Sequence, residues 1–196
     1  MNIQRRLGIS ALIAGLAAAL AGSPYRPLRG HLDVEQTARL IMDGDDHVSA
    51  LQLAAWIKER KPGLRVIDVR LPEQFGQYAI PTAENLPLDV LLRTGFSAQD
   101  IIVLYSEGGA HAAQAWALLR AMGVSNAWFI AGGLADWHEQ VHAPVLARDA
   151  TAQQVQAFEA QAQLSRYFGG VPSIGDVASG TSGVAIGAVK PHRRGC

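Results

Sequence analysis

The stretch IIVLYSEGGAHAAQAWALLRAMG, residues 101–123, combines a continuous apolar run, a glycine-containing loop and a helical pattern. Residues 101–105 are mostly β-branched or aromatic, which is typical of a strand buried on both faces of a parallel sheet. Residues 110–122 are predicted to form a helix that ends at Gly123, because glycine adopts the left-handed conformation after a helix at little cost. A strand that leads through such a loop into a helix N-terminus is a common place for a functional site.

The same alternation of strands and helices continues on both sides of this stretch. Further strands are predicted at 47–49, 64–69, 85–86 and 126–130, and further helices at 50–61, 71–78, 88–93 and 132–141. This order predicts an α/β fold in which a parallel sheet is covered on both faces by helices. We expect Ser49 to cap the helix 50–61. The inner face of that helix and two further tryptophans are expected to lie in the core: Leu51, Ala54, Trp56, Ile57, Trp116 and Trp137.

The first residues have the three parts of a secretory signal peptide. MNIQRR is a short basic start, residues 7–21 (LGISALIAGLAAALA) are apolar, and Ala19-Leu20-Ala21 is a small-x-small cleavage site. The apolar run is short for a membrane-spanning helix, which needs about 20 residues. We therefore expect residues 1–21 to be a signal peptide and the protein to be exported, to the periplasm or outside the cell. The alternative is an uncleaved membrane anchor formed by residues 7–21.

The segment 22–45 begins as a Pro- and Gly-rich spacer and continues into a short amphipathic helix. Val34, Ala38 and Ile41 recur at helical spacing, so this face is expected to lie against the domain. The domain itself is predicted to span residues 46–145.

The chain beyond the domain divides into two parts. Residues 146–168 are rich in Ala and Gln and are predicted to be helical. Residues 169–196 are rich in Gly and show little apolar periodicity, so we expect a mostly flexible tail.

The composition excludes several functional classes. The 196 residues contain 17 basic and 17 acidic side chains, so no electrostatic footprint for nucleic acid is present. Cys196 is the only cysteine, which rules out an internal disulfide and a zinc site built from cysteines. We predict no metal and no cofactor, and a membrane contact only through an uncleaved N-terminal segment.

Four sequence blocks in this order resemble the rhodanese-like, or thiosulfate sulfurtransferase-like, family. Asp68 and Arg70 follow the strand 64–69 and Pro81 precedes the short strand, as in that family. The remaining matches are the loop 106–111 and the later glycines and tryptophan, Gly132, Gly133 and Trp137. The resemblance covers about residues 46–144 and implies a five-stranded parallel sheet with helices on both faces.

The resemblance also implies where the chemistry is done. The family's loop begins with a catalytic cysteine, which takes a sulfane sulfur as a persulfide while the loop amides and helix N-terminus lower its pKa. In this chain Ser106 stands at that position, Gly109 matches the loop glycine and His111 closes the loop. Because a hydroxyl has a far higher pKa and forms no stable persulfide, we expect no sulfur transfer by the family mechanism.

The loop Ser106, Glu107, Gly108, Gly109, Ala110 and His111 is therefore an active-site-like loop with three open interpretations. In the first interpretation the loop binds a small anion or ligand at its amides and helix N-terminus, although the carboxylate of Glu107 counts against this. In the second the loop is purely structural, with Ser106 capping the helix and His111 in a structural hydrogen bond. In the third Ser106 is a hydrolase nucleophile activated by His111, although the Gly-x-Ser-x-Gly elbow is incomplete. We expect Asp68 and Arg70 to support the loop by charge-assisted hydrogen bonds.

Two functional hypotheses remain. The first is an exported, catalytically inactive rhodanese-like module that binds an anion or a protein partner at the Ser106 loop. The alternative is an enzyme of sulfur metabolism in which Cys196 or an external thiol carries the sulfur.

Overall fold

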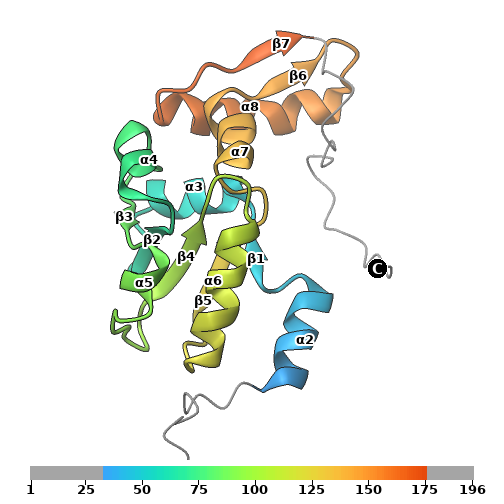
Figure 1. The fold of residues 1–196 in the computed structure, drawn as a ribbon. Helices are drawn as coiled ribbons and strands as arrows, with labels where there is room; N and C mark the ends of the chain where they lie inside the picture. Colours follow the sequence, from blue (N-terminus) through green and yellow to red (C-terminus); the bar gives the residue numbers. More distant parts are fainter. Residues whose placement is uncertain (1–32, 176–196) are drawn as a thin grey trace, which may run out of the picture. The chain divides into compact units, whose positions relative to one another are not determined.

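The computed structural model describes residues 33–175, in which helices and strands alternate along the chain (Figure 1). The strands of this part are β1 (His47–Val48), β2 (Leu64–Asp68), β3 (Glu84–Asn85), β4 (Ile101–Tyr105), β5 (Ala127–Ile130), β6 (Val145–Ala147) and β7 (Ser173–Gly175). Its helices are α2 (Val34–Asp43), α3 (Ala50–Lys58), α4 (Pro72–Gln77), α5 (Leu88–Leu91), α6 (Ala110–Ala121), α7 (Gly133–Trp137), the π-helical turn η1 (His138–His142) and α8 (Ala152–Tyr167).

Five strands form one sheet in the order β1-β5-β4-β2-β3, and all their pairings are parallel. The predicted α/β fold with a five-stranded parallel sheet is confirmed, and β1 lies at one edge of the sheet. β2 and β4 pair in register from Leu64 opposite Ile101 to Asp68 opposite Tyr105. Because both strands end at the same edge of the sheet, the residues that follow them are brought together there.

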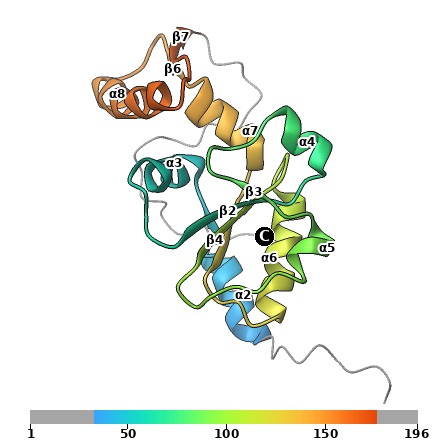
Figure 2. The same cartoon turned by 90° about the vertical axis from the view of Figure 1, so that its left-hand side faces the viewer.

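Helices cover both faces of the sheet, as the alternating pattern predicts (Figure 2). Side chains on one face pack with α3, α7 and η1: Val66, Val103, Tyr105 and Ile130. Side chains on the other face pack with α5 and α6: Ile67, Ile102, Leu104 and Phe129. Successive residues of a strand point to opposite faces, so a strand buried on both faces is apolar throughout.

The prediction of which face of α2 lies against the domain was wrong. The helix forms as predicted, with the side chain of Asp33 accepting the N–H of Gln36 at its start. However, Val34 and Ile41 are 68% and 55% exposed, and Ala38 is exposed as well. Helical periodicity identifies an apolar face but not which neighbour that face meets.

An adjacent side of α2 contacts the domain. Thr37 is buried, and Leu40 packs against the cluster formed by α6 and the sheet. Arg120 of α6 also donates to the side-chain oxygen of Gln36, at 3.4 Å. These contacts decide the orientation of the helix.

The inner face of α3 was only partly predicted. Ser49 caps the helix by accepting the N–H of Gln52, and Ala54 and Ile57 are buried as expected. Leu51 and Trp56 are only half-buried at the rim of the cluster. The ammonium group of Lys61 lies 4.0 Å from the centre of the Trp56 ring, so this ring contacts a cation as well as the core.

Trp116 and Trp137 lie in the core as expected. The helix predicted over residues 146–168 is present as α8 but begins at Ala152, because residues 145–147 form β6 instead. The start of the expected flexible tail, however, forms β7, which pairs in parallel with β6. The N–H groups of Val171 and Ser173 donate to the carbonyls of His142 and Pro144 at 2.8 and 3.0 Å. Backbone pairing of this kind leaves no apolar periodicity in the sequence.

Several expectations concern residues outside the described part of the chain. They are the signal peptide or anchor within 1–21, the spacer up to residue 32, and the tail from residue 176 with Cys196. Within residues 33–175, no helix has the length and apolar character needed to cross a bilayer.

Candidate functional site

The loop that follows β4 starts with a buried serine. Ser106 is 1% exposed, and its Oγ accepts the N–H of Ala112, in the first turn of α6, at 3.3 Å. The hydroxyl therefore satisfies one of the N–H groups that a helix start leaves without a partner.

The loop is held against the turn that enters α7. Leu134 and Ala135 donate their N–H groups to the carbonyls of Ser106 and Glu107, at 2.9 and 3.2 Å. A Cβ on Gly133, whose φ is +59°, would lie 2.2 Å from the Ser106 carbonyl oxygen. Glycine at this position is thus required by the close approach of the two segments.

Gly109 is a second position that accepts only glycine. Its φ is +85°, and a Cβ there would lie 1.8 Å from the carbonyl oxygen of Ala131. The conformation lets the loop turn into α6, where the Gly109 carbonyl accepts the N–H of Ala113 at 2.9 Å. The glycines at 109 and 133 therefore fix the path of the loop on both sides of Ser106.

The loop amides have no hydrogen-bond partner within the described residues. Within residues 33–175, the N–H groups of Glu107, Gly108, Gly109, Ala110 and His111 donate to no protein acceptor. Consecutive unpaired amides at the start of a twelve-residue helix favour an anion, because the positive end of the helix dipole adds to them.

A buried ion pair lies beneath the loop. The Arg70 Nε and Nη2 atoms donate to the Asp68 carboxylate at distances of 2.7 to 3.1 Å, and Asp68 is fully buried. Arg70 Nη1 donates to the Glu107 carboxylate at 2.9 Å. The structure thus brings Asp68, Arg70 and the loop together.

Burial and hydrogen bonding shift the pKa values of Arg70 and of the neighbouring Tyr105. Burial acts to lower the pKa of Arg70, but its bonds to Asp68 and Glu107 outweigh that effect, so the pKa is raised. Burial, followed by the hydrogen bond to Asp68, raises the pKa of Tyr105 above its ordinary value. The guanidinium is therefore always charged and Tyr105 stays a neutral phenol.

His111 does not take the structural role that the sequence suggested. Its side chain is exposed and makes no hydrogen bond within the described residues. The expectation of a structural hydrogen bond was wrong, because the first turn of α6 directs this side chain to solvent. It also forms no hydrogen bond with Ser106, so the described chain contains no assembled Ser–His pair for hydrolysis.

Two further residues complete the support of the loop and were missed from the sequence. The Tyr78 carbonyl accepts from Arg70 Nη2 at 2.7 Å. The Asn85 side chain donates to the carbonyls of Asp68 and Arg70, at 3.1 and 2.9 Å. Both contacts involve backbone carbonyls, so no side-chain motif could have indicated them.

The described residues contain no group of three or more His, Cys, Asp or Glu side chains placed to hold a metal ion. The site thus consists of backbone amides, a hydroxyl and a buried ion pair.

Residues 49–140, which include β2, the loop and α7, match the family model of the rhodanese-like domain. This part of the chain is a rhodanese-like domain. The order of strands and the position of the loop after the central strand β4 agree with the resemblance seen in the sequence. No curated protein matches the chain.

Solved structures similar to this part of the chain include rhodanese-like and rhodanese-related proteins. The rhodanese-like domain of an Anabaena protein is 25% identical, with a TM-score of 0.44 over 47% of this chain and 72% of its own. A rhodanese-like domain protein from Staphylococcus aureus is 26% identical, with a TM-score of 0.43 over 47% of this chain and 90% of its own. A rhodanese-related protein from Thermoplasma volcanium is 24% identical, with a TM-score of 0.40 over 46% of this chain and 88% of its own.

Proposed function

We propose that this rhodanese-like protein is an exported binding module, which holds a small oxyanion on the amides of the loop 106–111 and does not transfer sulfur through that loop. The observation that carries the proposal is the contact of Ser106 Oγ with the N–H of Ala112. A buried hydroxyl in this position caps a helix and leaves the next amides of the loop for a ligand.

The chemistry of oxygen supports the loss of sulfur transfer. Lowering a pKa by one unit takes about 1.4 kcal/mol, and a helix N-terminus supplies at most about 2 kcal/mol. Such a field ionises a thiol whose pKa is about 8.5, but not an alkyl alcohol. Ser106 also has no base, since the neighbouring His111 makes no hydrogen bond to it in the described chain.

Glu107 is the main electrostatic objection to an anion on this loop. Its carboxylate pairs with Arg70, which also binds Asp68, so the cation is shared between two acids. The side chain of Glu107 is 70% exposed, and water screens its charge. We therefore expect weak anion binding that strengthens when the charge of Glu107 is removed.

Anion titration of the labelled protein tests the proposal. Sulfate or thiosulfate should shift the amide resonances of residues 107–111 in a saturable way. Glu107→Gln should tighten this binding, and Gly109→Ala should weaken it because the loop must move away from Ala131. Gly95→Ala, at a position with no atom within 4 Å of the added Cβ, is the matched control and should bind like the wild type.

Two results would contradict anion binding at the loop. One is the absence of saturable shifts at residues 107–111 in the folded protein. The other is an equal response in Gly109→Ala, which would place the anion elsewhere.

Export rests on the N-terminal sequence alone. Expression of the full chain, fractionation and N-terminal sequencing should find a mature protein that starts at Gly22 outside the cytoplasm. A membrane-bound protein that retains residues 7–21 would favour the anchor instead.

A further inference from the structure

Two histidines follow α7 on the π-helical turn η1. The turn is closed by the N–H of Ala143, which donates to the His138 carbonyl at 2.8 Å, five residues earlier. His138 and His142 are four residues apart, so their side chains project from the same side of the turn. π-helical turns are rare and occur often at functional sites.

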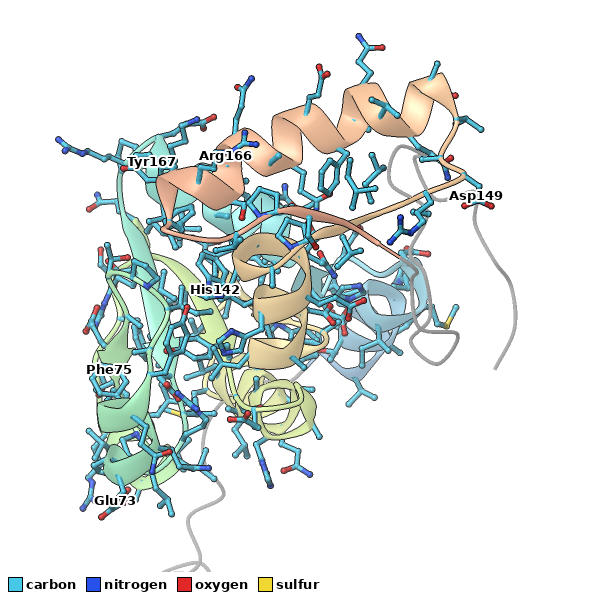
Figure 3. All side chains as sticks on the ribbon, turned by 90° about the horizontal axis from the view of Figure 1, so that it is seen from above. Glu73, Phe75, His142, Asp149, Arg166 and Tyr167 are labelled. Atoms are coloured by element: carbon cyan, nitrogen blue, oxygen red, sulfur yellow. The ribbon has the colours of Figure 1, made fainter. Side chains whose placement is uncertain are left out.

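The two imidazole rings lie close together. Their centres are 5.6 Å apart and their planes are inclined by 79°. His138 is exposed and His142 half-buried beside the ribbon of η1 (Figure 3). Within residues 33–175, the ring nitrogens of His138 and His142 have no hydrogen-bond partner. By contrast, Nδ1 of His47 is hydrogen-bonded to the Asp46 carboxylate at 2.7 Å.

This separation is close to that of two imidazoles sharing one metal ion. With metal–nitrogen bonds of about 2.0–2.1 Å and tetrahedral angles, the ring centres would be about 5 Å apart. The observed distance of 5.6 Å lies within about 1 Å of that value.

Tyr78 forms a fixed wall beside the pair. Its ring centre lies 4.7 Å from that of His138 and 6.4 Å from that of His142. The indole N–H of Trp137 donates to the Tyr78 hydroxyl at 2.9 Å, and Arg70 holds the Tyr78 carbonyl at 2.7 Å. Tyr78 thus packs against both imidazoles, and its hydroxyl is already engaged by the Trp137 indole.

We propose that His138 and His142 together bind one divalent transition-metal ion of the Zn²⁺ or Cu²⁺ type, with water in the remaining coordination positions. Imidazole nitrogens are suitable ligands for these ions. Because the described residues supply two ligands, the ion is expected to be exchangeable and not required for folding.

The test uses Zn²⁺ alone and the full chain carrying Cys196→Ser, which removes the competing thiol. Titration calorimetry should detect a Zn²⁺ site. His138→Gln and His142→Gln should each lower its affinity at least about tenfold, because the one remaining imidazole binds the ion without a second ligand from the same molecule. His111→Gln is the matched control, since this side chain is also exposed and unbonded in the described chain, and it should leave the affinity unchanged.

Thermal unfolding of the metal-free variants separates a lost ligand from a lost fold. The proposal expects each variant to unfold within a few degrees of the parent protein. Unchanged Zn²⁺ affinity in both His138→Gln and His142→Gln would overturn it. So would a Zn²⁺ site that already disappears in the Cys196→Ser parent.

Discussion

Arg70 leaves β2 and donates a hydrogen bond of 2.9 Å to Glu107, 37 residues later in the chain, in the loop that leaves β4. The parallel register of the two strands, with Asp68 opposite Tyr105, makes this contact. Asp68 is buried beside the guanidinium and forms an ion pair with it. One cation therefore connects a core carboxylate to the candidate site.

Arg70→Ala should destabilise the protein by about 3–5 kcal/mol, because it leaves the buried carboxylate of Asp68 without its cation. Urea unfolding followed by circular dichroism measures the effect. Arg93→Ala is the matched control, since its pair with Asp89 is exposed on both sides, and it should change stability by no more than about 0.5 kcal/mol. Equal effects of the two variants would contradict the role assigned to Arg70.

Gly109→Ala should cost more than about 2 kcal/mol, because it combines a positive φ with a Cβ that meets the Ala131 carbonyl. Gly108→Ala in the same loop should cost less than about 1 kcal/mol, since no atom lies within 4 Å of the added Cβ. Denaturant midpoints of the two variants provide the comparison. A stable Gly109→Ala variant would mean that the loop follows a different path.

Ser106→Cys should restore a sulfur acceptor in the loop. After treatment with thiosulfate, mass spectrometry should detect one added sulfur on this variant, removable by cyanide. The variant is made in the Cys196→Ser background, and Ser106→Ala in that background serves as the control. A folded Ser106→Cys variant that acquires no sulfur would show that the loop is not organised to stabilise a persulfide.

The native protein should produce no thiocyanate above the blank when it is incubated with thiosulfate and cyanide. The reason is that the loop carries a hydroxyl where a thiol is needed. Thiocyanate formation that is lost in Cys196→Ser would instead support the alternative in which the terminal thiol carries sulfur.

Acid should weaken the contact between β2 and β3. Hydrogen bonding to Arg65 lowers the pKa of Glu84 below its ordinary value of 4.5, although burial opposes this. A carboxyl whose pKa is lower in the folded state contributes stability above pH 4.5, and this contribution is lost as the pH falls through the folded-state pKa. Stability measured from pH 7 to pH 3 should therefore fall less steeply in Glu84→Gln than in the parent.

The strands and helices of the domain were predictable because each has its own local signal. The apolar run 101–105 has the composition of a buried strand, and Gly123, with φ of +88°, follows the end of α6 as expected. Ser106, Asp68 and Arg70 could be placed near one another because parallel strands end at a common edge. The contacts of Tyr78 and Asn85 could not, since Tyr78 accepts from Arg70 through its own backbone carbonyl and Asn85 donates to the backbone carbonyl of Asp68.

The amino-acid sequence alone determined the order of strands and helices, the loop at the end of β4 and the hydroxyl at its first position. Those features depend on neighbours in the chain, through side-chain periodicity and the conformations open to glycine. Only the tertiary structure decided that Val34 and Ile41 of α2 face outward, that β7 pairs with β6, and that Arg70 binds both Asp68 and Glu107. These outcomes depend on which segments meet in space, where burial and hydrogen bonding between distant residues outweigh local preference.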